Sequence, residues 1–100
     1  MLLMLRRIVV IALLLPIVAV RADALQDAAT AAARKDYATA LRLLEPLAQS
    51  GNARAQTQLA TLHYHGLGVA ESDQSAAQWY ERAARQGHAP AQFQLANLYA

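Results

Sequence analysis

Gly51-Asn-Ala-Arg-Ala-Gln-Thr-Gln-Leu-Ala-Thr-Leu62 is followed, 36 positions later, by the similar stretch Gly87-His-Ala-Pro-Ala-Gln-Phe-Gln-Leu-Ala-Asn-Leu98. Eight of the twelve positions are identical: Gly51/Gly87, Ala53/Ala89, Ala55/Ala91, Gln56/Gln92, Gln58/Gln94, Leu59/Leu95, Ala60/Ala96 and Leu62/Leu98. The same offset places Ala40 on Ala76, Glu45 on Glu81 and Ala48 on Ala84. A repeat period near 36 residues is typical of solenoids built from helical hairpins.

The segments of this repeat have the apolar spacing of amphipathic helices. Over 53–65, Ala55, Leu59 and Leu62 recur at i, i+4 and i+7 and therefore share one face. The opposite face is polar and contains Arg54, Gln58, Thr61 and His65. Equivalent apolar stripes are Ala76, Trp79, Tyr80, Ala83 and Ala84 over 73–86, and Ala40, Leu41, Leu44 and Leu47 over 37–49. The sequence predicts an all-α fold, an α-solenoid of antiparallel helical hairpins.

Residues typical of helix ends flank these segments. Asp36 and Ser72 stand where a side chain accepts a hydrogen bond from a first-turn amide. Gly51 and Gly87 follow helices, at a position where a positive φ is common. The stretch 66–72, Gly-Leu-Gly-Val-Ala-Glu-Ser, predicts a sharp connection that returns Leu67 and Val69 to the core. A phosphate-binding loop is disfavoured for Gly-x-Gly here, because no strand precedes it and no third glycine follows.

Together these positions resemble the Sel1-like repeat, a relative of the tetratricopeptide repeat. The resemblance covers 53–87 and rests on Ala55, Leu59, Ala60, Gly66, Gly68, Val69, Ala76, Trp79, Tyr80, Ala83, Ala84 and Gly87. His63 departs from the usual tyrosine, which Tyr99 restores one repeat later, and Ser72 replaces the usual capping aspartate.

The sequence predicts four parts. We expect a signal peptide over 1–24 and, from the repeat register, a divergent helical hairpin over 25–51, a complete repeat over 52–87 and the first helix of an incomplete further repeat over 88–100. A solenoid repeat buries its apolar face against the next one. We therefore expect Phe93, Leu95 and Leu98 to be exposed and to favour self-association or a partner chain. A truncated product without independent function is an open alternative.

The first 24 residues have the pattern of a secretory signal peptide. Arg6 and Arg7 precede the apolar run Ile8–Val20, and Ala22-Asp23-Ala24 supplies a small-residue cleavage site. Thirteen residues at 1.5 Å each extend about 20 Å, whereas a bilayer core is about 30 Å thick. We expect cleavage after Ala24, with Ala22 as a second choice, and no stable membrane span afterwards. Retention as an uncleaved anchor is the alternative. The expected location is a bacterial periplasm or the secreted fraction.

Composition and charge exclude several classes of function. The chain has 100 residues, no cysteine and a formal net charge of +2. From Leu25 onward, six basic residues (Arg34, Lys35, Arg42, Arg54, Arg82 and Arg85) balance six acidic residues (Asp27, Asp36, Glu45, Glu71, Asp73 and Glu81). Because no basic cluster remains to neutralise phosphates, nucleic-acid binding is not expected.

Neither the histidines nor the serines form a recognisable chemical motif. His63 and His65 are spaced i, i+2, which points two imidazoles about 200° apart on a helix and disfavours shared metal ligation. Ser50, Ser72 and Ser75 lie where capping or turn formation explains them. Trp79 and Tyr80 are assigned to packing between helices. We expect no catalytic residue, no metal and no cofactor.

What the resemblance implies is protein binding on the concave side of the solenoid, which the first helices of successive hairpins line. The expected surface consists of Arg54, Gln58, Thr61 and His65, continued by Gln94 and Asn97. It is polar and nearly uncharged, so it favours hydrogen bonds to a protein or peptide partner over electrostatic steering. The hypothesis is an exported, non-catalytic adaptor. An exported hydrolase or cell-wall enzyme of the repeat family is the alternative.

Overall fold

The structure, a computed structural model, describes residues 24–100, so the expected signal peptide and its cleavage site lie outside the described residues except for Ala24. A first helix occupies 24–33. It is followed by α2 (Tyr37–Gln49), α3 (Ala53–His65), α4 (Asp73–Arg85) and α5 (Ala89–Leu98). Residues 24–100 contain no strand, which confirms the predicted all-α class. None of the helices in this range has the length and hydropathy that a membrane span requires.

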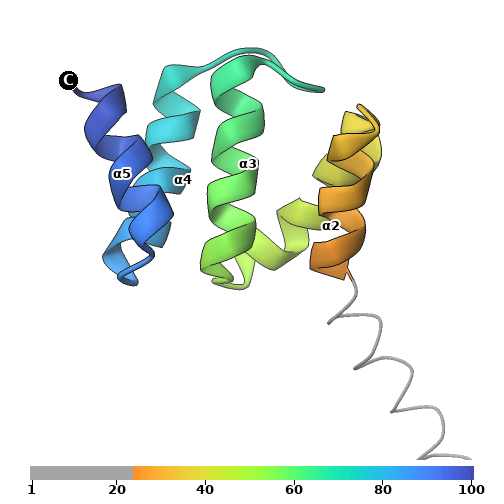
Figure 1. Cartoon of the computed structure of the whole chain (residues 1–100), viewed down its shortest axis with the longest axis horizontal. Helices are drawn as coiled ribbons and strands as arrows, with labels where there is room; N and C mark the ends of the chain where they lie inside the picture. The colour runs from red at the N-terminus through yellow and green to blue at the C-terminus, as the bar shows by residue number, and fades with distance from the viewer. Residues whose placement is uncertain (1–23) are drawn as a thin grey trace, which may run out of the picture.

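The helices stand side by side in a row, with α3 at its centre (Figure 1). On one side of α3 lie α4 and then α5, and on the other lie α2 and the first helix. Successive helices run antiparallel and form hairpins, as the repeat period predicts. This order places the first helix, α3 and α5 at corresponding positions in three successive units, in which α2 and α4 are the second helices of the first two hairpins.

The core consists of two clusters that α3 joins. One cluster lies between the first hairpin and α3, and contains the fully buried Leu44 and Leu59. The other lies between α3, α4 and α5 and contains Ala60, Ala76, Tyr80, Ala83 and Ala91. Many of the buried residues are alanines, whose small side chains allow the helices to approach closely. The core faces predicted for the three helices are therefore confirmed.

The predicted helix ends are present. The Asp36 carboxylate accepts a hydrogen bond from the Thr39 amide at 3.3 Å. The Thr39 side-chain hydroxyl, and after it this backbone amide, holds the pKa of Asp36 below its ordinary value. The Ser72 hydroxyl accepts from the Ser75 amide at 3.1 Å. Gly51 and Gly87 have positive φ angles of 103° and 84°, as expected. In addition, the Asn52 side chain caps α3 by accepting from the Ala55 amide at 2.9 Å.

The connection between α3 and α4 reaches back across the top of the row towards the first hairpin (Figure 1). Its two apolar side chains, Leu67 and Val69, pack against the first core cluster, as predicted. Gly68, with φ +75°, lies against Tyr37 and Leu41 of α2; a Cβ placed on it would approach a side-chain atom of each to 2.8 Å. The loop thus binds the complete repeat to the hairpin before it.

The expectation for the outer apolar residues of α5 is only partly correct. Phe93 is 65% exposed, as expected. Leu95 and Leu98 are half-buried and pack against the second core cluster, so the expectation that they are exposed is wrong. The reason is geometric: they lie on the same face as the buried Ala91, which turns towards α4 and α3, whereas Phe93 lies on the opposite side of the helix.

Candidate functional site: two grooves beside α3

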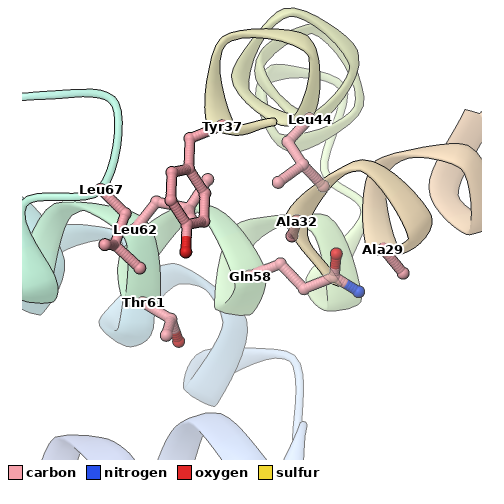
Figure 2. A pocket seen from close by; sticks show the side chains of 8 residues that line it. All are labelled: Ala29, Ala32, Tyr37, Leu44, Gln58, Thr61, Leu62 and Leu67. Carbon is pink, nitrogen blue, oxygen red and sulfur yellow. The ribbon is translucent and has the colours of Figure 1, made fainter. Parts of the chain in front are cut away.

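A groove open to solvent lies between the first helix and α3 (Figure 2). Its volume is about 370 Å³, and we call it the first groove. It is lined by Ala29, Ala32, Tyr37, Leu44, Gln58, Thr61, Leu62 and Leu67. Most of this lining is aliphatic, and none of these residues carries a charge. The groove can therefore bury an apolar side chain of a partner without a charged group being desolvated.

Two polar side chains reach into the first groove without a hydrogen-bond partner among residues 24–100. Tyr37 is the first residue of α2, and its hydroxyl points into the groove between Leu67 and Gln58 (Figure 2). The Gln58 amide lies on the side of the groove away from Leu67. Within residues 24–100, neither side chain makes a hydrogen bond. An amide donates and accepts, as does a hydroxyl, so the pair can bond both the N–H and the C=O of an extended peptide.

A second, smaller groove lies one repeat further along, between α3 and α5. Its volume is about 200 Å³, and it is lined by Tyr64, Tyr80, Gln94, Asn97 and Leu98. This second groove has a higher share of polar groups than the first, because Gln94 and Asn97 both present amides. The two grooves flank α3 and together form the candidate binding surface.

Thr61 and Tyr80 form a hydrogen-bonded bridge between the grooves. The two hydroxyl oxygens are 2.8 Å apart. The Thr61 hydroxyl also donates to the Thr57 carbonyl at 3.1 Å, which leaves Tyr80 as the donor in the shared bond. Burial of Tyr80, which is 3% exposed, raises the pKa of its phenol above the ordinary value. Thr61 therefore lines the first groove with a hydroxyl that is already engaged.

The six residues expected to bind a partner are distributed over this surface. Gln58 and Thr61 line the first groove, and Gln94 and Asn97 line the second. Arg54 and His65 are exposed at the two ends of α3 and line neither groove. The structure therefore places four of the six residues in the two grooves, one pair in each. The other two, Arg54 and His65, lie outside the grooves at the ends of α3.

Sequence reasoning missed the residues that other helices contribute to the grooves. Tyr37 comes from α2 and Leu67 from the loop after α3, whereas the pattern of a single helix identifies only that helix's own face. Tyr64 belongs to α3 but is 40% exposed and packs edge-on against His65, with ring centroids 4.9 Å apart. Trp79 and Tyr80 pack between helices as expected, and the Arg82 guanidinium lies 4.6 Å from the Trp79 ring centroid.

Gln56 joins three helices behind the grooves. It is 1% exposed, and its amide nitrogen donates to the Ala48 carbonyl of α2 at 3.0 Å. Its amide oxygen accepts from Gln86, just after α4, also at 3.0 Å. One repeat later, Gln92 donates in the same way to the Ala84 carbonyl at 3.1 Å, at an exposed position. The repeated glutamine therefore fixes each first helix to the end of the helix before it.

We expect Gln56→Leu to lower the free energy of unfolding by about 1–3 kcal/mol, because the Ala48 carbonyl and the Gln86 amide lose a buried partner. The repeat-equivalent Gln92→Leu is the matched control and should cost no more than about 0.5 kcal/mol, because its bond is exposed. Urea unfolding monitored by circular dichroism measures both. Equal losses for the two variants would contradict the role assigned to Gln56.

The serine and histidine side chains, which are catalytic or metal-binding residues in many proteins, lie at helix ends, in turns or on helix surfaces in this structure. The Ser50 hydroxyl donates to the Leu47 carbonyl at 2.8 Å, and the Ser72 hydroxyl donates to Ser75 at 3.1 Å. His63 is half-buried, His65 is exposed, and His88 precedes α5 without a side-chain capping bond. Among residues 24–100 there is no cluster of three or more histidine, aspartate or glutamate side chains with the geometry of a metal site.

A row of antiparallel helical hairpins, with grooves formed mainly by the first helices, defines a helical-repeat protein. Residues 30–52 and 53–88 match the Sel1 repeat, and the chain belongs to the Sel1 repeat family. Comparison with curated proteins and with solved structures gave no significant match. Sel1 repeats generally mediate protein–protein interaction and are typically non-catalytic.

Proposed function

We propose that the protein is an exported, non-catalytic adaptor that holds an extended segment of a protein partner across its concave side. The observation that carries this proposal is the first groove, where an aliphatic floor lies beside two polar side chains, Tyr37 and Gln58, without intramolecular hydrogen bonds within residues 24–100. An apolar side chain of the partner enters the groove, and the flanking backbone bonds to the amide and the hydroxyl.

The lining residues also favour an uncharged partner segment. Neither groove is lined by a lysine, arginine, aspartate or glutamate. A charged side chain buried in the first groove would lose hydration without gaining an opposite charge, which is costly. Binding should therefore depend only weakly on salt, since little of its free energy comes from interaction between ions.

The export part of the proposal rests on residues 1–24. The basic start with Arg6 and Arg7, the apolar run Ile8–Val20 and the small residues ending at Ala24 favour cleavage and release. The adaptor then acts in a bacterial periplasm or in the secreted fraction, in a compartment where its lack of cysteine makes folding independent of the redox conditions.

Site-specific photocrosslinking in the producing cell tests this proposal. A benzophenone amino acid placed at Gln58 should give a discrete crosslinked product with another protein, because this side chain faces the first groove. The same probe at Glu45, an exposed position on α2 that lines neither groove, is the matched control. Fractionation of the same cells reports whether the crosslinked chain is exported.

The outcomes separate the two parts of the proposal. A Gln58 product that is absent at Glu45 and found in the exported fraction supports both parts. A product found only in the cytoplasm contradicts export but leaves the groove as the binding surface. Equal crosslinking at the two positions, or none at Gln58, contradicts the groove.

A further inference from the structure

The two grooves beside α3 occupy equivalent positions of the internal repeat. Subtracting the offset of 36 from the residues of the second groove leads to residues of the first at four positions: Tyr80, Gln94, Asn97 and Leu98 correspond to Leu44, Gln58, Thr61 and Leu62. The remaining residue of the second groove, Tyr64, corresponds to the buried Ala28. The grooves are therefore two versions of one site, and their differences indicate what each is suited to bind.

A groove at this position is a feature of the repeat itself. The first groove is open although α4 and the loop after α3 follow it, and Leu67 of that loop forms part of its wall. Both grooves have a glutamine and a leucine at equivalent positions, Gln58 and Leu62 in the first and Gln94 and Leu98 in the second. Each groove therefore offers one amide beside an apolar contact.

The first groove is the larger and the more aliphatic of the two, at about 370 Å³. Leu44 forms its floor where the second groove has a tyrosine. The Thr61 hydroxyl is already bonded to Tyr80 and to the Thr57 carbonyl. A bulky aliphatic side chain of a partner therefore gains burial here and leaves no polar group of the floor without a partner.

The second groove, at about 200 Å³, favours an amide side chain. Gln94 and Asn97 are exposed, and neither side chain makes a hydrogen bond within residues 24–100. An incoming amide can donate to one and accept from the other, whereas an aliphatic side chain would cover both without bonding to either. A charged side chain would meet no opposite charge in the lining, which is costly.

A single extended segment can reach both grooves by crossing α3. An α-helix with its side chains is about 10–12 Å across. An extended chain advances about 3.1–3.4 Å per residue, so three or four residues cover this width. Side chains return to the same face after three residues in a polyproline II helix and after four in a β-strand. Two side chains at either spacing can therefore enter the two grooves together.

We propose that the two grooves together select one uncharged partner segment, in which a bulky aliphatic residue for the first groove lies three or four residues from an asparagine or glutamine for the second. This inference rests on the proposed adaptor function and adds to it the sequence that the partner must carry. The aliphatic residue packs on Leu44 and Leu62, and the amide bonds to Gln94 and Asn97.

Synthetic peptides with blocked ends, added to the full chain, test this selection. Each peptide contains one central leucine, two asparagines and six serines. The asparagines lie three residues from the leucine in the first peptide, four in the second and one in the control, so that all three have the same composition. NMR titration measures the dissociation constants and the side-chain amide resonances of Gln58, Gln94 and Asn97. At least one spaced peptide should bind at least about fivefold more tightly than the control and shift all three resonances, because its second contact is linked to the first.

Asn97→Leu tests whether the second groove recognises the outer residue of the peptide. Without this amide, the preference should move from outer asparagines to outer leucines, because the groove becomes apolar. Ala96→Leu is the matched control, at an exposed position of the same helix that lines neither groove, and should leave the preference unchanged.

The contrary outcomes separate this inference from the adaptor function. Equal affinity for the three peptides, with shifts confined to Gln58, overturns the paired selection and leaves the first groove as the binding surface. No binding of any peptide also overturns it, whereas the crosslink from Gln58 decides the adaptor function independently. An unchanged preference in Asn97→Leu overturns it as well, since the outer residue would then contact another surface.

Discussion

Replacing Leu59 with alanine is expected to lower the free energy of unfolding by about 3–5 kcal/mol, among the largest losses for any single residue in this fold. Leu59 is 1% exposed and belongs to α3, which joins the two core clusters. The lost burial and the remaining cavity both contribute to the cost. A domain of this size is stable by only about 4–11 kcal/mol. Circular dichroism during urea unfolding should therefore show a much earlier transition.

Leu98→Ala is the matched control for Leu59→Ala. Leu98 is the same residue type on an apolar helix face, but it is half-buried at the end of α5. Because less surface is returned to water, the expected loss is about 1–2 kcal/mol. If both leucines cost the same, α3 is not the helix that couples the two clusters, and the arrangement of the core described above is wrong.

The second large effect is expected for Gly68→Ala, with a loss of about 2–4 kcal/mol. Its φ of +75° costs an alanine about 1 kcal/mol or more. The added Cβ would also approach side-chain atoms of Tyr37 and Leu41 to 2.8 Å, and relieving this overlap costs about 1–3 kcal/mol more. The loop should then detach from α2, which thermal unfolding and the amide resonances of the loop would both report.

Gly87→Ala separates these two contributions. Gly87 also has a positive φ, +84°, but a Cβ placed there meets no atom within 4 Å. Gly87→Ala should therefore lower the free energy of unfolding only by the cost of a positive φ for alanine, about 1 kcal/mol. A loss at Gly68 no larger than at Gly87 would show that the loop does not pack tightly on α2.

The fold could be predicted from local sequence patterns because the apolar spacing of one helix occurs again one repeat later. The spacing of Ala55, Leu59 and Leu62 defines the buried face of α3, and the same residues at 91, 95 and 98 define that of α5. Asp36 and Ser72 mark helix starts through a bond that involves only the next three residues. Such signals depend on short stretches of chain, so the sequence contains them in full.

The candidate site was less predictable because its walls come from elements far apart in the sequence. Gln58 and Thr61 followed from the polar face of one helix, but Tyr37 enters the first groove from α2 and Leu67 from a loop. The identity of Gln56 with Gln92 was visible, yet its bonds to Ala48 and Gln86 depend on how three helices meet. The half-burial of Leu95 and Leu98 likewise depends on where α4 lies.

The central claim is that the first groove holds the partner, and filling the groove tests it most directly. Ala29 lines the groove and is exposed, so Ala29→Trp should occupy the groove without disturbing the core. Ala33→Trp, at an exposed position of the same helix outside the groove, is the control. The measurement is the calorimetric dissociation constant for the partner identified by crosslinking at Gln58. The account predicts at least about tenfold weaker binding, or 1.4 kcal/mol, for Ala29→Trp alone. Unchanged affinity for both variants, with unchanged unfolding temperatures, would contradict it.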